Sequence, residues 1–543
     1  MRHSRTQDAA RRSARVRARL ATTAVLAMTL SASLPGPAEA GAAHTAPAER
    51  WTTRTPAPGV TVRTGVIRHP GITHSWTVTV QAPRGTRPAP DDPDAPVTWA
   101  EVATRTWAHD TARRLTGAGL RPRVESVRWP RYADTPHGLM GYRVRVGRFT
   151  TRDEARATAS AVTAAGFHPT LSWTGYDAQE PADLENIHVA VIDPETFDGS
   201  VEATHDGDVT RRATTSAVAR ELRSLVAVNG GFFVLSPADG VPGTMSGIGA
   251  YDGELESMAV GSRSALLLAD GGHDLRIADL TSTVTARSAD AAYRIQGIDR
   301  LPGTVRDCGR PGGTPTELPR QDVTCRLADD MVAFTPAFRA ALPTGAGAQV
   351  VLDASGRVVS AGPRGGRVPA DGRVLQGIGR AAGWLTAHAG PYDRIRVDET
   401  VRDTRGGRIT LHGGDSLVSA APTLVRNGRV DIDAAAEGVV DPADTSFGYA
   451  WADVRQPRTL AGIDRRGRLL LVTADGRLTN GSEGFTLHEA AVFMKSLGAV
   501  QAMNLDGGGS TAMAVNGTLV NQPSDATGER AVGDTVQVLP ARH

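Results

Sequence analysis

The chain has 543 residues, of which 40% are hydrophobic and 22% are charged, and its formal net charge is +2. This composition excludes a disordered tail and a fibre, and the length predicts roughly two to four globular domains. The near-neutral charge gives no indication of a nucleic-acid partner.

Residues 1–40 have the pattern of an export signal. Seven arginines precede the apolar run Leu20 to Leu34, and the segment ends in Ala38-Glu39-Ala40. We interpret it as a signal peptide cleaved after Ala40, with general secretion favoured over the twin-arginine route. Its removal takes away seven arginines and two acidic residues and leaves a formal charge of −3. No later run is long enough for a transmembrane segment, so the protein is expected to be secreted, either free or associated with the cell wall.

The next two segments differ in character. Residues 41–73 begin with a stretch rich in alanine, proline and threonine and are expected to form a flexible leader. Residues 74–176 carry a doubled β-α-β pattern, with strands predicted over 74–81, 121–127, 142–147 and 168–173 and helices over 101–117 and 151–165. Thr151 is the expected N-cap of the second helix, and Glu154 completes a capping box. The pattern predicts a small ferredoxin-like sandwich.

The second half of this unit resembles the sporulation-related repeat (SPOR) domain. The residues that fit the SPOR pattern are Tyr142, Val144, Val146, Gly147, Phe149, Ala155, Ala161 and Gly166. The first half departs from the pattern through a Pro/Asp-rich insertion at 82–96. The resemblance implies a module that binds peptidoglycan glycan strands through its sheet face, whereas the alternative is that these residues are only core and turn positions.

Residues 187–543 are predicted to form one large mixed domain, with an insertion at about 281–345. Strands are expected over 187–193, 225–228, 265–268, 349–352, 469–474, 499–505 and 511–515. The predicted fold class is therefore mixed α/β (α+β), a large mixed-sheet domain preceded by the small SPOR-type sandwich. Cys308 and Cys325 are the only two cysteines, and in an exported chain they favour a disulfide over free thiols or a metal pair.

The stretch Asn504-Leu-Asp-Gly-Gly-Gly-Ser-Thr-Ala-Met513 has an unusual composition. An apolar strand ends at Asp506, and three glycines follow, which permit positive φ angles and close approach of a ligand to the main chain. Beyond them, Asn516-Gly517 predicts a two-residue hairpin. A carboxylate beside a row of backbone N–H groups is suited to holding an anion while the carboxylate faces a reacting carbon. Taken alone, the stretch favours a glycine-rich turn in which Asp506 bonds its own backbone.

Four further motifs accompany this stretch in a fixed order. They are Asn229-Gly-Gly-Phe-Phe233, Pro457–Arg477, Gly484–Ala499 and Val520–Arg530. Together with the glycine stretch they resemble the phosphodiester glycosidase family, whose animal members remove N-acetylglucosamine from a sugar-1-phosphodiester. The resemblance covers about residues 187–540. One departure is Ala421-Pro422, where the family pattern has Gly-Pro, which leaves the identity of the substrate more open than the activity.

The resemblance implies roles for individual residues. It implicates Asp506, Glu489 and Asn229 in catalysis, and Arg458, Thr459, Asp475, Arg477, Gly507, Gly508, Gly509 and Ser510 in binding substrate or phosphate. Simpler roles stay open for several of them. Thr486 and Glu489 have the spacing of a capping box, Asp475-Gly476 is a turn signal, and Asn229 would also suit a turn.

The chemistry of a sugar-1-phosphodiester fits these residue types. Its phosphate leaves as a stable anion, so the enzyme has to neutralise phosphate and stabilise an oxocarbenium-like centre. Arginine forks and glycine N–H groups serve the first need. A carboxylate, Asp506 with Glu489 as the alternative, serves the second by activating water or attacking C1; retention and inversion both stay open.

Two other function classes compete with a secreted phosphodiester glycosidase. One is a non-catalytic cell-wall glycan-binding protein on the same fold. The other is a phosphoesterase, which usually needs two metal ions, whereas the histidines here are scattered singly. The sequence predicts no cofactor and no metal ligands, and leaves a structural divalent cation open. The expected partners are a glycan or sugar-phosphodiester substrate and peptidoglycan through residues 74–176.

Overall fold

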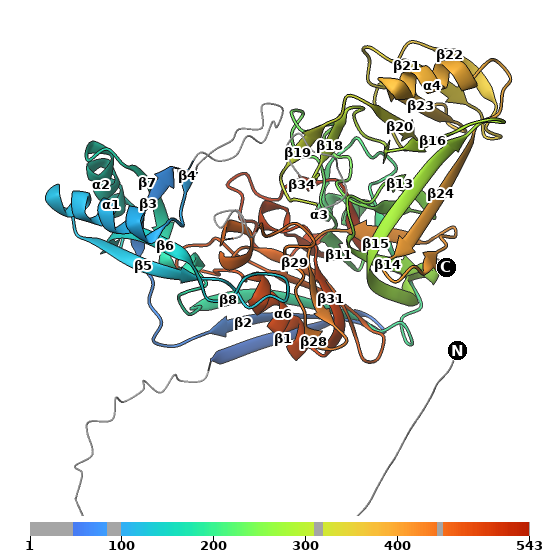
Figure 1. Cartoon of the computed structure of the whole chain (residues 1–543). Coiled ribbons are helices and arrows are strands. Elements are labelled where there is room, and N and C mark those ends of the chain that lie inside the picture. Colours follow the sequence, from blue (N-terminus) through green and yellow to red (C-terminus); the bar gives the residue numbers. More distant parts are fainter. Residues whose placement is uncertain (1–46, 84–98, 309–318, 442–448, 542–543) are drawn as a thin grey trace, which may run out of the picture. The chain divides into compact units, whose positions relative to one another are not determined.

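The computed structural model describes residues 47–83, 99–308, 319–441 and 449–541 (Figure 1). The predicted signal peptide lies outside these residues. The secondary structure is 14% helix and 42% strand, arranged in several sheets, which confirms the α+β class. Among the described helices, none is both long and apolar enough to cross a membrane.

The segment predicted as a flexible leader contains two strands of an eight-stranded sheet, so that prediction is wrong for residues 48–68. Strands β1 (Ala48–Ala57) and β2 (Val60–Arg68) form a hairpin, and β2 pairs along its whole length with β8 (Leu184–Ile192). Val60 and Val62 of β2 are buried in the main core. The apolar alternation of β2 therefore outweighs the loop-like composition at the start of the segment.

The doubled β-α-β unit is present as predicted. Its elements are β3 (Trp76–Pro83), β4 (Trp99–Ala100), α1 (Arg105–Gly117), β5 (Pro122–Arg128), β6 (Leu139–Phe149), α2 (Arg152–Ala164) and β7 (His168–Trp173). The strand order β7-β3-β6-β5, all antiparallel, is that of a ferredoxin-like sheet. Both helices lie on one side of it (Figure 1). The capping box of Thr151 and Glu154 is confirmed.

The centre of the opposite face of this small sheet, on β3 and β6, is buried. Arg143 and Arg145 point from β6 to that face and are each 2% exposed. Arg143 donates a 2.7 Å hydrogen bond to the hydroxyl of Tyr449, and both arginines pair with Asp177. A glycan strand would have to displace Tyr449 and Asp177 to reach this face. These contacts do not support glycan binding at the centre of this face, and the expectation stays a prediction.

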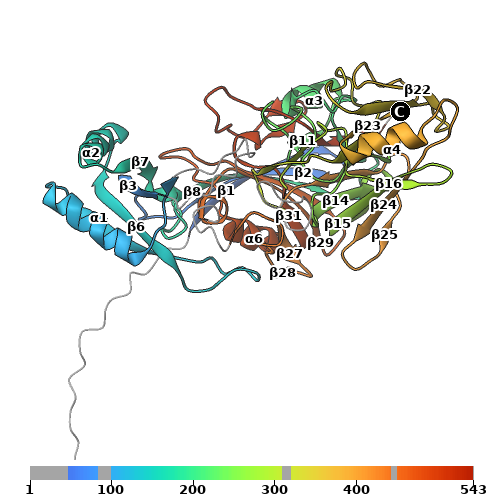
Figure 2. The same cartoon turned by 45° about the horizontal axis from the view of Figure 1, so that its top comes forward.

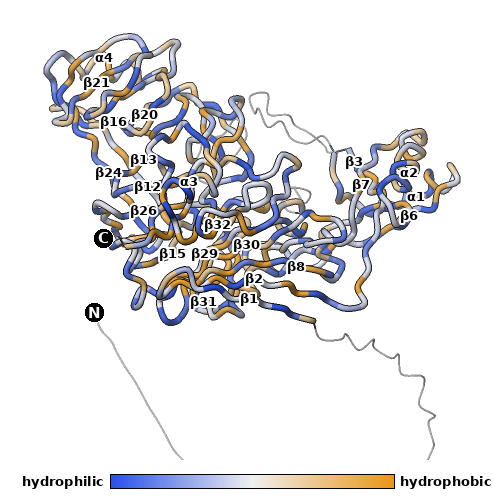
Figure 3. The backbone as a smooth tube through the Cα atoms, turned by 180° about the vertical axis from the view of Figure 1, so that it is seen from behind, coloured by the Kyte–Doolittle hydropathy of each residue, from blue (hydrophilic) through white to orange (hydrophobic). Residues whose placement is uncertain are grey.

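One of the two eight-stranded sheets has the antiparallel order β1-β2-β8-β30-β29-β31-β27-β28. Beyond β1, β2 and β8 its strands are β30 (Leu469–Ala474), β29 (Arg458–Asp464), β31 (Ala499–Asn504), β27 (Thr423–Arg426) and β28 (Arg429–Val430). Helix α6 (Leu487–Ser496) packs on β27 and β31. Every residue of β29 is buried, as the central position of this strand requires, and hydrophobic segments gather around β29, β30 and β31 (Figure 3).

A second sheet has the order β33-β32-β11-β35-β9 and packs on the same core. Its strands are β33 (Thr518–Leu519), β32 (Met513–Val515), β11 (Val226–Asn229), β35 (Thr535–Leu539) and β9 (Ser200–Thr204). Helix α3 (Thr215–Glu221) lies against β11, and β10 (Ala213–Thr214) pairs with β34 (Ala531–Val532) (Figure 2). The hairpin predicted at Asn516-Gly517 is confirmed by the pairing of β32 with β33.

A third sheet has the order β13-β12-β26-β14-β15-β24-β25, with β16 also on β15. Its strands are β13 (Glu254–Ser257), β12 (Gly249–Tyr251), β26 (Ser416–Ser419), β14 (Arg263–Ala269), β15 (Asp274–Arg287), β24 (Arg396–Asp403), β25 (Arg408–Ile409) and β16 (Ala292–Ile295). The predicted start of the insertion, residue 281, thus falls within β15. The insertion continues this sheet and is not separated from it.

A fourth sheet, β17-β20-β23-β21-β22, begins within the predicted insertion and continues past its expected end at residue 345. It consists of β17 (Gly297–Ile298), β20 (Asp330–Phe334), β23 (Arg373–Ile378), β21 (Ala348–Leu352) and β22 (Val358–Gly362), with α4 (Arg380–His388) against β23 (Figure 2). Strands β18 (Thr304–Arg306) and β19 (Thr324–Arg326) pair beside it. Cys308 and Cys325 form the predicted disulfide.

The remaining helical segments are short. They are η1 (Thr174–Tyr176), η2 (Asp270–Gly272), the π-helical turn η3 (Tyr449–Asp453) and η4 (Gly508–Ser510). The seven strands predicted in the large domain are all present as β8, β11, β14, β21, β30, β31 and β32, with small shifts of their ends.

Candidate active site

The predicted site residues meet because four strands begin or end at the same place. In the antiparallel registers, Arg458 at the start of β29 faces Ala474 at the end of β30, and Leu460 faces Asn504 at the end of β31. Asp475 and Asp506 therefore leave the sheet on either side of Arg458. Strand β11 of the second sheet also ends here, at Asn229.

The glycine loop is built around Asp506. One carboxylate oxygen of Asp506 accepts a 2.9 Å hydrogen bond from the backbone N–H of Gly507, and Ser510 donates a further one. The backbone N–H of Asp506 donates to the carbonyl of Gly230 at 3.0 Å. Gly508 has a φ of +60°, a value that glycine adopts readily. The sequence Gly507–Ser510 therefore folds back over the carboxylate as a tight turn.

Burial raises the pKa of Asp506 to about 7, because a carboxylate loses solvation there. The hydrogen bond from Ser510, the positive charge of Arg530 and the N–H of Gly507 oppose this rise, whereas the negative charge of Asp322 adds to it. Asp322 lies within the loop closed by the disulfide, between β18 and β19. A carboxyl group with this pKa can exchange a proton near neutral pH.

Asn229 holds the loop through hydrogen bonds from both ends of its side-chain amide. Its side-chain N–H donates a 2.7 Å hydrogen bond to the carbonyl of Asp506. Its side-chain oxygen accepts from the hydroxyl of Thr459 at 2.6 Å and from the N–H of Ala512 at 3.1 Å. Asn229 and Thr459 are both fully buried. These contacts hold the loop in place, and the catalytic role expected for Asn229 and the binding role expected for Thr459 stay predictions.

Two arginines flank the glycines. A Cβ atom on Gly508 would lie 3.4 Å from the guanidinium nitrogens of Arg477, and one on Gly509 would lie 2.1 Å from a guanidinium nitrogen of Arg530. Loss of solvent, followed by the positive charge of Arg530, lowers the pKa of Arg477. Arg530 also pairs with Asp525 at 2.8 Å. Two guanidinium groups beside a glycine loop are suited to binding an anion.

The sequence motifs did not predict a role for Arg530, although Arg530 is the last residue of the motif Val520–Arg530. The available signal in the sequence was an arginine five positions after an aspartate, Asp525. Arg477 was expected, and its guanidinium also donates a 2.7 Å hydrogen bond to the side-chain oxygen of Gln456.

Arg458 is buried, whereas a residue that binds phosphate directly is expected to be accessible. Its side chain is buried, and its Nε donates a 3.0 Å hydrogen bond to the carbonyl of Phe485. Burial lowers the pKa of Arg458 to about 10, partly offset by the nearby Tyr132 and Glu489. Gly507 lies against its Cδ and Cα atoms. Arg458 therefore packs against the glycine loop at Gly507.

Glu489 is committed to other partners. Its carboxylate completes the predicted capping box with Thr486 at the start of α6. The same carboxylate accepts hydrogen bonds of 3.1 and 2.6 Å from the guanidinium of Arg455. Arg455 is 2% exposed and also donates to the carbonyls of Gly175 and Asp177, which follow the small sandwich. These contacts describe a structural ion pair better than a free catalytic carboxylate.

Asp475 is also a structural carboxylate. It is buried and accepts a 3.0 Å hydrogen bond from the N–H of Gln522, and Asn521 and Asn186 donate to it as well. Burial raises the pKa of Asp475 to about 6. It thereby ties the turn that carries Arg477 to the segment that leads to Arg530.

Metal ligands are not concentrated at this site. Within residues 47–83, 99–308, 319–441 and 449–541, no group of three or more His, Cys, Asp or Glu side chains is arranged to hold a metal ion. The cis peptide bond at Ala421-Pro422, the departure noted above, lies beside β31, where the carbonyl of Ala421 accepts from Asn504 at 2.8 Å.

Parts of this chain are similar to known proteins. Residues 346–539 match the family model of phosphodiester glycosidases. The N-acetylglucosamine-1-phosphodiester alpha-N-acetylglucosaminidases of Mus musculus and Homo sapiens are each 37% identical to this chain, over 110 and 129 residues. These alignments cover 20% and 24% of this chain and only 21% and 24% of the two relatives.

A solved structure covers much more of the chain. It belongs to a candidate exported protein of Burkholderia pseudomallei K96243, with 32% identity and a TM-score of 0.78 over 91% of this chain and 97% of that one. The fold described above, including much of the region before the large domain, is therefore shared by that protein.

Proposed function

We propose that this chain, whose residues 346–539 match the phosphodiester glycosidase family, hydrolyses the glycosidic C–O bond of a sugar-1-phosphodiester. The observation that carries the proposal is the position of Asp506. A carboxyl group with a pKa near neutrality lies in the same loop as three glycines and two flanking arginines. Such a pairing of a titrating carboxyl with an anion site fits a reaction that expels phosphate from a sugar carbon.

In this proposal the phosphate lies on the glycine loop. Arg477 and Arg530 neutralise its charge, and Ser510 and the backbone N–H groups of Gly507–Gly509 complete the cradle. Arginine forks suit two phosphate oxygens at once, and their positive charge also stabilises the phosphate as it departs. The phosphate then needs little protonation as it leaves. The reaction therefore needs no second carboxyl group as a general acid for the phosphate.

Asp506 acts at the sugar carbon. In its ionised form it either removes a proton from the attacking water or attacks C1 itself. Glu489 is held by Arg455 and Thr486, and Asp525 by Arg530, so neither competes with Asp506 for this role. Asn229, Thr459, Asp475 and Arg458 keep the loop and its two arginines in place.

Secretion and a substrate in the cell envelope belong to the same proposal. They are supported by the export-signal pattern, by the disulfide and by the likeness to a candidate exported protein. The alternative of a non-catalytic glycan-binding protein is disfavoured by Asp506, since a binding site for phosphate gains nothing from a buried carboxyl group beside it.

The experiment that tests the proposal follows the cleaved bond. Purified protein is incubated with an activated sugar-1-phosphodiester in water enriched in heavy oxygen. Mass spectrometry then locates the label in the products. The proposal requires the label in the sugar hydroxyl. Label in the phosphate would identify a phosphoesterase, and the absence of turnover across several sugars would favour the binding protein.

A further inference from the structure

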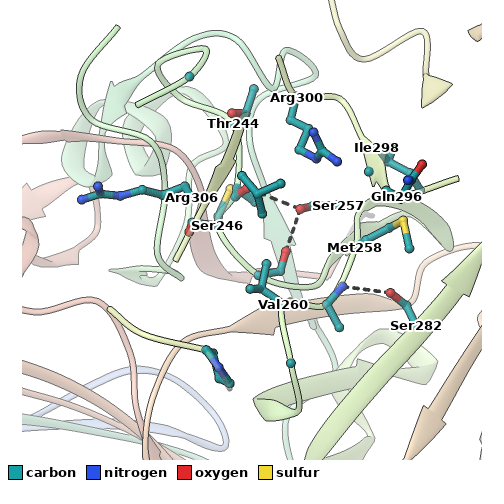
Figure 4. Close-up of a pocket in the computed structure, with 18 of the residues that line it drawn as sticks. Thr244, Ser246, Ser257, Met258, Val260, Ser282, Gln296, Ile298, Arg300 and Arg306 are labelled. Atoms are coloured by element: carbon teal, nitrogen blue, oxygen red, sulfur yellow. Dashed lines mark hydrogen bonds between the residues drawn. The ribbon is translucent and has the colours of Figure 1, made fainter. Parts of the chain in front are cut away.

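A cavity of about 600 Å³ lies among β13, β15 and β17, and its described lining residues include none of the glycine loop (Figure 4). The contacts that support Arg477 come instead from the junction between the small sandwich and the sheet of β8 and β30. His74 lies just before β3, and Trp173 is the last residue of β7. The N–H of Ser75 donates a 3.0 Å hydrogen bond to the hydroxyl of Thr174. The chain therefore enters and leaves the small sandwich at the same place.

The turn that carries Arg477, residues 477–483, contains an unfavourable backbone conformation. Arg477 has a φ of +58°, a value that residues with a long side chain adopt rarely. Within the turn, the N–H of Leu478 donates a 3.1 Å hydrogen bond to the carbonyl of Ser482. A conformation of this kind persists only where the surrounding structure holds it. The position of the Arg477 guanidinium therefore depends on the contacts of the turn.

Tyr176, which follows the small sandwich, holds the middle of this turn. Its hydroxyl shares a 3.1 Å hydrogen bond with the hydroxyl of Thr479. Its carbonyl accepts a 2.7 Å hydrogen bond from the N–H of Arg455. The next residue, Gln456, accepts a 2.7 Å hydrogen bond from the guanidinium of Arg477. Tyr176 is therefore connected both to the turn and to the segment that contacts the Arg477 side chain.

Glu483 holds the end of the turn. Its side chain is 2% exposed, and one carboxylate oxygen lies 3.1 Å from Nε2 of His74. The other oxygen accepts a 3.0 Å hydrogen bond from the N–H of Asp183. Gly175 fits here because it has no side chain, since a Cβ atom would lie 1.8 Å from the oxygen that faces His74. Residues before and after the small sandwich thus meet at one carboxylate of the turn.

We propose that the junction of the small sandwich positions Arg477 for phosphate, with Tyr176 and Glu483 as the positioning residues. The inference rests on the proposed function and extends it, because the domain predicted over 187–543 then does not complete the phosphate site by itself. In the observed arrangement Arg477 faces Gly508, where a Cβ atom would lie 3.4 Å from the guanidinium nitrogens. When the contacts of the junction are lost, the turn relaxes and Arg477 moves away from the glycine loop.

The test removes the hydrogen bond between Tyr176 and Thr479 from either end. Tyr176→Phe and Thr479→Val each delete one hydroxyl. Calorimetry measures the Kd of inorganic phosphate, and steady-state kinetics measure KM and kcat for an activated sugar-1-phosphodiester. Each variant should raise Kd and KM by about threefold to tenfold, the effect of one lost hydrogen bond, with a smaller change in kcat. The double variant should bind no more weakly than either single variant, because both changes remove the same bond.

Two conservative changes separate this role from a general loss of structure. Thr479→Ser keeps the hydroxyl and should retain the affinity. Tyr392→Phe removes the hydroxyl of an exposed tyrosine before β24 and should leave Kd and KM unchanged. Melting curves show whether each variant is folded.

Gly175→Ala tests the contact with Glu483, because the added methyl group collides with the carboxylate. This variant should raise Kd and KM at least as much as Tyr176→Phe. Gly117→Ala is the matched control on the small sandwich, since nothing lies within 4 Å of a Cβ atom there. It should keep both values.

Unchanged Kd and KM in Tyr176→Phe and Thr479→Val would overturn the inference, as would losses that add in the double variant. Absence of phosphate binding by the unmodified protein would also overturn it. Failure of the proposed function would be seen separately, as absence of hydrolysis by an unmodified protein that binds phosphate, and the comparison of Kd values would then still test the positioning of Arg477.

Discussion

The side-chain amide of Asn229 donates a 2.7 Å hydrogen bond to the backbone carbonyl of Asp506 and so fixes the loop that carries the reacting carboxylate. The other end of the same amide binds Thr459 and Ala512. Three segments that are distant in sequence are therefore held by one buried side chain, and the geometry of the proposed site depends on it.

Asn229→Asp tests this positioning role. The variant places a carboxylate oxygen against the carbonyl of Asp506 and loses a buried hydrogen bond, so we expect a loss of about 1–3 kcal/mol in the free energy of unfolding together with a fall in kcat. Denaturant unfolding and steady-state kinetics measure the two effects. Asn480→Asp, at an exposed turn position, is the control. An unchanged kcat in a stable Asn229→Asp protein would contradict the role.

The pKa of Asp506 predicts a pH dependence of both activity and stability. Because burial raises this pKa to about 7, kcat/KM should rise with pH and level off above about pH 7, as the ionised form accumulates. Stability should change in the opposite direction: the folded state holds the proton more tightly, so the contribution of Asp506 is present at low pH and is lost between about pH 4 and 7.

Comparison with Asp506→Asn isolates that contribution from the other buried carboxyl groups. The difference in unfolding free energy between the two proteins should vary over the same pH window. A difference that stays constant from pH 4 to 8 would show that the pKa of Asp506 is not raised.

Gly509→Ala tests the close approach of Arg530 to the loop. The new methyl group would lie 2.1 Å from a guanidinium nitrogen of Arg530 and 2.3 Å from a carboxylate oxygen of Asp525, so this ion pair has to move. We expect KM to rise about tenfold or more, with a smaller change in kcat, measured by steady-state kinetics. Gly362→Ala, where nothing lies within 4 Å, should behave like the unmodified protein; a similar KM in both variants would remove Arg530 from the phosphate site.

Arg477→Lys should impair substrate binding, whereas Arg458→Lys should impair stability. Arg477 is exposed and faces the glycines, so lysine keeps the charge, loses the fork and should raise KM while the melting temperature stays the same. Arg458 is buried and donates to the carbonyl of Phe485, so lysine should lower the melting temperature. Kinetics and melting curves for both variants distinguish them, and a reversal of the two effects would exchange their assigned roles.

Much of this site could be predicted from the sequence because its signals are local. The end of an apolar strand, three glycines and a capping box are each determined by neighbouring residues, and the structure has the strand ends and both capping boxes where they were expected. The partners that act across the fold could not be predicted in this way. Glu489 has capping spacing whether or not Arg455 reaches it from another segment.

The hairpin of β1 and β2 is a second example of pairing that local sequence could not predict. The alternation of Val60 and Val62 marks a strand, yet only the pairing with β8, more than a hundred residues later, makes it part of the main sheet. Burial of the small sandwich's open face likewise depends on Tyr449, which no local pattern of β6 indicates.

The most direct test of the account is the turnover of Asp506→Asn measured beside that of Glu489→Gln. If Asp506 acts at the sugar carbon, Asp506→Asn should lose several orders of magnitude in kcat while it stays folded and still binds substrate. Glu489→Gln leaves the buried Arg455 without its counter-charge, so it should lose about 3 kcal/mol of stability and retain turnover where it is folded. Near-normal turnover in Asp506→Asn, with loss of turnover in a stable Glu489→Gln, would contradict the account and transfer the catalytic role to Glu489.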